Sequence, residues 1–360
     1  MRSYLVRRFL MAIPVILGIL IVTFTIARLI PGDPCHSALG EHATEAACAS
    51  FAARMGLDKP ILVQLGIYME NILFRGDFGD SIRYSRPVST LLIERLPVTL
   101  ELGTAAILLA VLVGVPAGIL SAVRRNSGVD VATMMGANIG VSMPVYWLGL
   151  MLAFVFAVYL KDTPFALPPS GRMTAGLLPA PFYEVWGWNL ARGSFAYLIA
   201  DFISNFAVFN SIITAQWEVL KDALAHLILP AVALSTIPLA IIARITRSSM
   251  LEVLGREYVR AARAKGVAER NVVMKHAFRN ALLPVVTVIG LQTGTLFAGA
   301  VLTESIFGFS GVGRALFDAI TGRDYPIIQA FTVVIAIGYV FINLVVDISY
   351  AFLDPRIKLS

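Results

Sequence analysis

The chain has 360 residues, of which 58% are hydrophobic and only 14% are charged. Soluble domains carry roughly 25% charged residues, so this composition excludes an ordinary water-soluble globular protein. A net charge of +6 would suit a nucleic-acid partner, but in a membrane chain basic residues mark the loops that stay in the cytoplasm. The composition therefore predicts an integral membrane protein that does not bind nucleic acid.

Six stretches are apolar enough to cross a bilayer as helices, because a hydrocarbon core about 30 Å thick requires roughly 20 apolar residues. They are residues 9–30, 100–123, 131–160, 227–245, 282–306 and 326–350. The third is long enough to tilt, or to continue beyond the membrane as ordinary helix. We therefore predict an all-α membrane protein with six transmembrane helices.

The distribution of lysine and arginine predicts the orientation. With the N-terminus inside, the inner segments carry more basic residues than the outer segments, on a much shorter length of chain. The positive-inside rule then places both termini in the cytoplasm and two long segments, residues 31–101 and 161–225, outside. Each contains an amphipathic stretch, 61–74 and 194–219, that can lie on the membrane surface. Polar residues inside the second stretch argue against a seventh span.

The only two cysteines, Cys35 and Cys48, fall in the first outer segment. If that segment faces an oxidising compartment, a disulfide is chemically permitted. Closing a loop of this size would stabilise the segment by roughly 3 kcal/mol. Two free thiols remain the alternative.

No stretch matches a phosphate-binding loop, a zinc-binding H-E-x-x-H helix, a nucleophile elbow or a C-x-x-C pair. The four histidines are scattered along the chain at His36, His42, His226 and His276. We therefore predict no catalytic residues, no metal site and no cofactor bound by this chain. The energy for any uphill transport would come from a partner or from an ion gradient.

The inner loop over residues 244–281 has the most informative pattern. Residues 251–264 are mostly good helix formers, and Gly266 follows at a position typical of a helix end. A second predicted helix, residues 269–282, leads to Pro284. The small side chains of Ala261 and Ala262 would let another protein approach the backbone closely. This favours a docking site made of the two predicted helices and the turn between them, called the elbow. The alternative is a basic loop that rests on anionic lipid.

This loop resembles the signature of the binding-protein-dependent ABC import permeases, whose core is Glu-Ala-Ala, three residues and then Gly. In this chain Arg260-Ala261-Ala262 precedes Arg263-Ala264-Lys265-Gly266, and the Leu-Pro pair comes later, at Leu283-Pro284. Arg260 stands in place of the leading glutamate, as in the peptide and nickel branch. The likeness continues in Pro31-Gly32-Asp33-Pro34, GDFGDSIRYSRPV from Gly76, LPVTLELG from Leu96, LTESIFGFSGVGRALFDAITGRDYP from Leu302 and DPRIK from Asp354. It omits only residues 163–219, and it is strongest to the B-type subunits of dipeptide permeases.

The resemblance implies the type I permease fold of ABC importers. Residues 1–95 would form an N-terminal transmembrane helix and a periplasmic segment, residues 96–353 a five-helix transmembrane domain, and residues 354–360 a cytoplasmic tail. The implied location is the bacterial inner membrane. The implied partners are a homologous second permease, two subunits that bind ATP and Mg²⁺, and a periplasmic substrate-binding protein.

The resemblance also implies the substrate and the coupling residues. Dipeptides or short oligopeptides are the expected cargo, with nickel and glutathione as alternatives. The expected coupling helix would dock in a groove of an ATPase subunit through Glu257, Tyr258, Arg260, Ala261, Ala262, Lys265 and Gly266.

The fifth span is the best candidate to line a polar route through the membrane. It carries Thr287, Gln292 and Thr295, while Gly290, Gly294 and Ala298 repeat a small residue every four positions, which suits helix packing. The charged residues near span ends, which are Arg28, Glu304 and Asp347, are expected at the interface or at helix caps. Without a carboxylate near mid-membrane, an ion-coupled carrier is disfavoured. The lack of a nucleophile–base pair or metal cluster disfavours an intramembrane enzyme.

A glycine-rich stretch, residues 307–325, should fold as a short outer helix. Together with residues 161–225 it would form the landing surface for a protein that delivers substrate. This expectation is a hypothesis about the outer face of the molecule.

Overall fold

The computed structural model describes residues 2–29, 35–36, 40 and 43–353. Within these ranges the chain is mostly helical, and the β pairing is limited to an isolated bridge between Asp80 and Pro87. The predicted tail over residues 354–360 and the motif Pro31-Gly32-Asp33-Pro34 lie outside the described residues.

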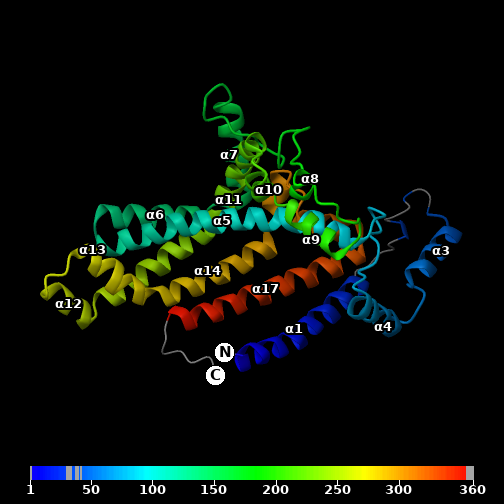
Figure 1. Cartoon of the computed structure of the whole chain (residues 1–360), viewed down its shortest axis with the longest axis horizontal. Helices are drawn as coiled ribbons and strands as arrows, with labels where there is room; N and C mark the ends of the chain where they lie inside the picture. Colours follow the sequence, from blue (N-terminus) through cyan, green and yellow to red (C-terminus); the bar gives the residue numbers. More distant parts are fainter. Residues whose placement is uncertain (1, 30–34, 37–39, 41–42, 354–360) are drawn as a thin grey trace.

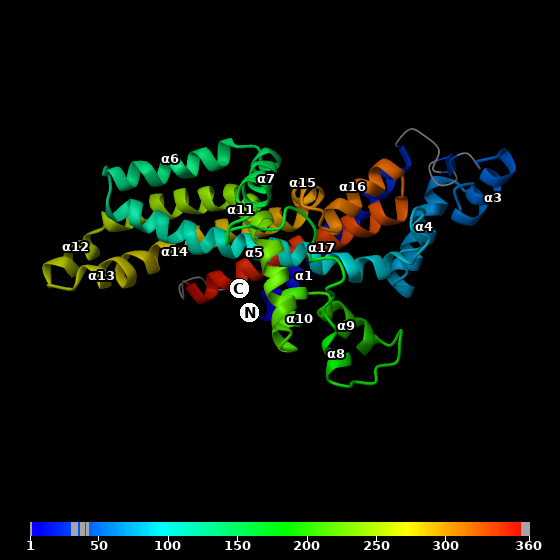
Figure 2. The ribbon, with the colours of Figure 1, turned by 90° about the horizontal axis from the view of Figure 1, so that it is seen from above.

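Five long apolar helices run along one axis (Figures 1 and 2). They are α1 (Arg2–Leu29), α5 (Val88–Val123), α11 (Trp217–Leu254), the helix from Glu269 to Phe297, and α17 (Tyr325–Leu353). The first and last predicted spans coincide with α1 and α17. Helices α5 and α11 begin earlier than the predicted spans, at Val88 and Trp217 instead of residues 100 and 227.

The third predicted span is not one helix. The chain forms α6 (Gly128–Ser142), bends by 101°, and continues as α7 (Val145–Phe154) and the π-helical η3 (Val155–Tyr159). Pro144 disfavours helical backbone in the residue before it, and Met143 is accordingly extended, with φ −82° and ψ 127°. The prediction of one continuous helix over residues 131–160, whether tilted or extending beyond the membrane, was therefore wrong.

The fifth predicted span also differs in its limits. Helices α13 (Glu269–Asn271), η4 (Val272–Phe278) and α14 (Arg279–Gly299) form one continuous run, and α15 (Val301–Ile306) follows a break at Ala300. A separate helix ending before Pro284 is therefore not formed. Proline removes a single backbone donor, and membrane helices tolerate this loss.

Shorter helices flank the bundle. Helices α3 (Glu45–Met55), α4 (Ile61–Glu70) and the π-helical η2 (Asn71–Arg75) lie at one end, and α16 (Val312–Gly322) is the expected helix of the glycine-rich stretch. Helices α8 (Phe182–Val185), α9 (Phe195–Ser204) and α10 (Ala207–Ile213) project from the side of the bundle (Figure 2). A bend of 98° between α9 and α10 means that these residues do not form a straight seventh span.

Close packing of α5 against α11 forms the centre of the bundle. A side chain on Gly114 would meet the carbonyl oxygen of Leu239 at 2.9 Å, and one on Gly118 would meet that of Ala243 at 2.6 Å. Small residues allow helix backbones to approach in this way in membranes. The adjoining core is apolar and joins α5, α11, α14 and the loop after α15.

The two ends of the bundle carry different segments. Helix α12 (Glu257–Ala264) lies at one end, whereas α3 and α4 lie at the other (Figure 1). The predicted topology requires this separation, because it assigns the basic loop and the first outer segment to opposite sides of the membrane.

Candidate functional site

Helix α12 forms a short elbow after α11. The predicted helix over residues 251–264 is interrupted, because α11 ends at Leu254 and Arg256 is extended, with φ −73° and ψ 149°. The intervening Gly255 is a poor helix former, which explains the break. At the far end Gly266 has a φ of +75°, a left-handed conformation that favours glycine and ends a helix.

An apolar cluster holds α12 on the bundle. Val259 of α12 and Val272 of η4 are completely buried, and Ala262 is 8% exposed between them. The cluster is completed by Val253, Leu254 and Val267. Because an isolated helix of eight residues is unstable in water, these contacts fix the position of α12.

The opposite face of α12 is exposed. Six of the seven predicted coupling residues are exposed: Glu257, Tyr258, Arg260, Ala261, Lys265 and Gly266. The two alanines differ, since Ala261 is exposed and Ala262 is buried in the chain's own cluster. The expectation that both alanines face the partner is corrected accordingly, and Ala261 is the small residue on the open face.

An ion pair closes the elbow across the Gly266 turn. Arg263 donates from Nη2 to Glu269 Oε1 at 2.6 Å and from Nε to Oε2 at 3.1 Å. The bond to Glu269 raises the pKa of Arg263. Glu269 begins the continuous helix that reaches Phe297, so this ion pair links α12 to the helix that contains α14.

A buried carboxylate connects three helices close to this elbow. Asp130 of α6 accepts hydrogen bonds from Arg247 Nε at 2.7 Å and Nη2 at 2.8 Å, from the Ser121 hydroxyl, and from the backbone N–H of Asn126 at 2.9 Å. The Asp130 side chain is 5% exposed. This network joins α5, α6 and α11, and sequence reasoning missed it, although an aspartate beside the basic turn Arg124-Arg125 was an available signal.

The predicted path residues lie along α14. Thr295 is exposed, Gln292 is half-buried, and Thr295 Oγ1 donates to the Gln292 carbonyl oxygen at 2.9 Å. Thr287 is half-buried and accepts from the Tyr350 hydroxyl at 2.9 Å. The structure therefore places Gln292 and Thr295 together, while Thr287 faces α17.

The glycines of α14 pack against α17. A Cβ on Gly290 would lie 2.0 Å from Val346 Cγ2, and one on Gly294 would lie 2.6 Å from Tyr339 Cε2. These distances confirm that the two glycines serve close helix packing.

Two of the charged residues near span ends have structural roles. Glu304 is completely buried and accepts from Thr99 Oγ1 at 2.6 Å and from the backbone N–H of Arg314 at 2.8 Å. Since Arg314 is in the first turn of α16, Glu304 caps that helix. Asp347 of α17 pairs with Arg8 of α1 at 2.8 Å.

Arg28 contacts neighbouring helices, and its expected position at the interface stays a prediction. Its guanidinium carbon lies 4.7 Å from the centre of the Phe24 ring and 4.8 Å from that of the Tyr325 ring. Its Nε donates to Gln64 Oε1 at 2.8 Å. Arg28 is therefore held between α1, α4 and α17.

Polar contacts fasten the segment before α11 to the bundle. Glu101 of α5 pairs with Arg172 at 2.6 Å and accepts from the backbone N–H of Val208 at 2.7 Å. Asp222 of α11 accepts from both the N–H and the hydroxyl of Thr174, at 2.8 and 2.6 Å. No sequence signal identifies these partners, because they are far apart in the chain.

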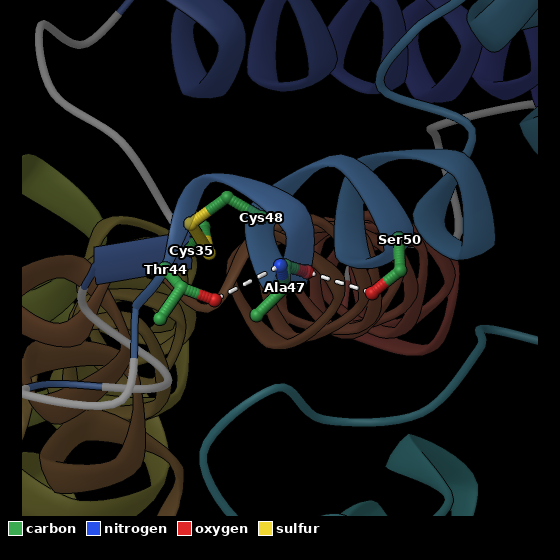
Figure 3. The surroundings of a disulfide bond; sticks show 5 residues. All are labelled: Cys35, Thr44, Ala47, Cys48 and Ser50. Carbon is green, nitrogen blue, oxygen red and sulfur yellow. Dashed lines mark hydrogen bonds between the residues drawn. A yellow bond between two sulfur atoms is a disulfide. The ribbon is translucent and has the colours of Figure 1, made fainter.

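The segment between α1 and α5 contains a disulfide (Figure 3). Cys35 is bonded to Cys48 of α3, and α3 begins with the cap residue Thr44, whose hydroxyl accepts from the Ala47 N–H at 3.3 Å. The bond connects the chain after α1 to this capped helix.

In the part of the chain that the structure describes, no three His, Cys, Asp or Glu side chains are grouped as metal ligands would be. The long apolar helices are those of a multi-pass membrane protein.

Comparison with known proteins identifies the family. Residues 114–359 match the family described as "Binding-protein-dependent transport system inner membrane component", and residues 1–103 match its N-terminal counterpart. The dipeptide transport system permease protein DppB of Alkalihalophilus pseudofirmus is 45% identical over 358 residues, covering 99% of this chain and all of the relative. DppB of Escherichia coli is 41% identical, and the di/tripeptide permease DppB of Pseudomonas aeruginosa is 42% identical, each over 359 residues and 99% of both chains.

The chain belongs to the binding-protein-dependent transport system inner membrane components. This result confirms the resemblance inferred from the inner loop and its flanking motifs. Members of the family are ABC permeases, which are transport subunits and not enzymes, and they work in complexes with other ABC components.

Proposed function

We propose that this chain is the permease subunit of an ATP-driven importer that carries dipeptides across the bacterial inner membrane. The near-complete coverage by relatives named as dipeptide or di/tripeptide permeases supports this substrate class over nickel or glutathione. The observation that carries the proposal is the exposed face of α12, at the end of the bundle remote from the disulfide. Both termini and α12 lie in the cytoplasm in this proposal.

The work of the importer is divided between subunits. Two ATPase subunits bind ATP and Mg²⁺ and contact α12 around Ala261, while this chain binds neither nucleotide nor metal. When the ATPases close on ATP, α12 moves, and its buried contact with Val272 carries the movement into the helix that contains α14. The permease then changes between outward- and inward-facing states, a two-state equilibrium that ligand binding biases.

A second, homologous permease completes the translocation path. Helix α14 leaves Leu291 and Thr295 exposed, beside the half-buried Gln292. Paired with a second permease, this face would give the peptide a route with polar groups and no fixed charge. Such a route binds peptide amides weakly enough to release them.

A periplasmic binding protein delivers the peptide to the outer face. The segment over residues 163–216 is suited to receive it, because Glu101 and Asp222 hold this segment rigidly on the bundle. Deleting residues 163–216 should abolish dipeptide uptake while the protein remains in the membrane. Normal uptake by that variant would remove the landing-surface assignment.

Co-purification with the ATPase subunits tests the central part of the proposal. The wild-type protein should co-purify with the ATPase subunits, and Ala261→Arg should not. Ala261→Ser should still co-purify with them, because the serine side chain is also small. Ala268→Arg adds the same charge at an exposed position beyond Gly266 and serves as the control. Equal ATPase recovery with Ala261→Arg and wild type would contradict the proposed docking.

A further inference from the structure

A groove lies between α1 and the second half of α17. Its volume is about 410 Å³, and most of its lining is apolar, with Val15 on the α1 side and Val340 on the α17 side. The Arg8–Asp347 ion pair is part of the same lining. Because α1 and α17 are both long and apolar enough to cross a membrane, the groove lies within the bilayer in the proposed topology.

Two polar side chains of α17 line this groove. Tyr339 is at the middle of the helix Tyr325–Leu353, and Asn343 is one turn further on, so the two share a helix face. In the part of the chain that the structure describes, neither the Tyr339 hydroxyl nor the Asn343 amide makes a hydrogen bond. Asn343 is half-buried, and its amide is not among the fully buried atoms that lack a partner. The amide is therefore accessible to a neighbouring molecule.

Polar groups close to these two have partners within the chain. Asp347 is one turn beyond Asn343 and pairs with Arg8 at 2.8 Å. The Tyr350 hydroxyl donates to Thr287 Oγ1 at 2.9 Å. The chain thus satisfies the polar groups at this end of α17 and leaves the two groups in the groove without partners.

Lipid chains cannot provide those partners. Hydrocarbon offers no hydrogen-bond donor or acceptor, so a polar group left alone in it is costly. Polar side chains inside membrane spans accordingly face other helices, and asparagine forms hydrogen bonds across helix pairs. The groove is therefore suited to a helix that carries a polar side chain, and not to an acyl chain.

We propose that a transmembrane helix of the second, homologous permease packs in this groove, with a polar side chain bonded to the Asn343 amide and the Tyr339 hydroxyl. This proposal rests on the proposed function, in which the second permease is the membrane-spanning partner. Helix α17 packs on α14 where Gly294 meets the Tyr339 ring, so the contact would lie one helix away from the predicted path. The face formed by α1 and α17 would then help to hold the two permeases together.

Photo-cross-linking from α1 tests the position of the partner. Val15 or Ile13 is replaced by benzoylphenylalanine; Val15 lines the groove and Ile13 does not, while the two are similarly exposed, at 51% and 52%. Irradiation of membranes that contain the whole importer should join the chain to the second permease from position 15, with the product identified by mass spectrometry of its peptides. The control at position 13 should give much less of this product.

Dissociation of the purified permease pair tests the polar contact. Asn343→Leu should weaken the association about threefold to tenfold on dilution in detergent, the value of one hydrogen bond between membrane helices. Asn343→Gln keeps an amide and should restore part of the affinity. Val345→Leu is the control, since Val345 is exposed on α17 outside the groove. Each variant chain alone should unfold near the wild-type temperature, because Asn343 has no hydrogen bond to lose within the described residues.

Three results would overturn the proposal. Cross-linking of position 15 to lipid alone would mean that an acyl chain fills the groove. Equal dissociation of Asn343→Leu and wild type, or stronger cross-linking from position 13 than from position 15, would place the second permease elsewhere and leave the proposed function intact. Failure of the wild-type chain to associate with any second permease would contradict the proposed function itself, and the groove assignment with it.

Discussion

Replacing Gly290 by alanine should weaken the packing of α14 on α17. The added Cβ would lie 2.0 Å from Val346 Cγ2, 3.2 Å from its Cβ and 3.3 Å from its Cγ1. Carbon atoms normally pack at about 3.5–4.0 Å, so the closest pair would have to separate by roughly 1.5 Å. Val346 cannot rotate away easily, because a β-branched side chain has one strongly preferred rotamer in a helix.

The expected cost follows from these distances. Overpacking a tight contact costs about 1–3 kcal/mol, and a clash this short belongs at the upper end. Alanine recovers up to about 1 kcal/mol through its better helix propensity. The net loss of unfolding free energy should therefore be about 2 kcal/mol.

Thermal unfolding of the purified protein in detergent measures the effect. Gly290→Ala should lower the unfolding temperature, and adding Val346→Ala should restore most of it. Gly338→Ala on α17 is the control, since a Cβ there meets no atom within 4 Å, and it should unfold at or above the wild-type temperature. The packing argument fails if Gly290→Ala and Gly338→Ala unfold at the same temperature.

Three further variants test other contacts. Glu101→Gln weakens the anchor of the segment before α11, so limited proteolysis should cut residues 163–216 faster than in wild type; equal rates would contradict this role. Asp130→Asn leaves Arg247, whose side chain is 27% exposed, without its charge partner, and should lower the unfolding temperature. Adding Arg247→Gln should recover part of that loss in thermal unfolding, and strict additivity would argue against a direct pair. Cys48→Ser opens the disulfide and should make α3 more sensitive to protease while the bundle unfolds at the same temperature; a large drop in unfolding temperature would mean that the disulfide supports the whole fold.

Hydropathy and motifs predict the long helices of this protein but not the positions at which the helices are interrupted. Helices α1 and α17 follow directly from their apolar length. The bend before α7 was not predicted, because the apolar composition of residues 131–160 favoured one helix in spite of Pro144. The effect of a proline on the preceding residue was sufficient to predict an extended Met143. Gly255 likewise indicated the break between α11 and α12, but the residues on both sides of it favour helix.

The sequence predicts which segment forms the site, but it does not predict which side chains of that segment are exposed. The motif located α12, but which alanine faces outward depends on what lies beneath it. Val259 and Ala262 are three residues apart and so share a helix face, which was the available clue. The contacts of Arg28 with Gln64 and Tyr325 could not be predicted, because these residues come from three separate helices and no local pattern connects them.

Thiol cross-linking at α12 tests the central claim most directly. Both native cysteines are in the Cys35–Cys48 disulfide, so Ala261→Cys introduces the only free thiol. With a short bifunctional reagent in inverted membrane vesicles, Ala261→Cys should cross-link to an ATPase subunit, and the yield should change when ATP and Mg²⁺ are added. The buried Ala262→Cys should give little product. Labelling of Ala261→Cys by an impermeant reagent from outside intact cells, with no ATPase cross-link, would contradict the account.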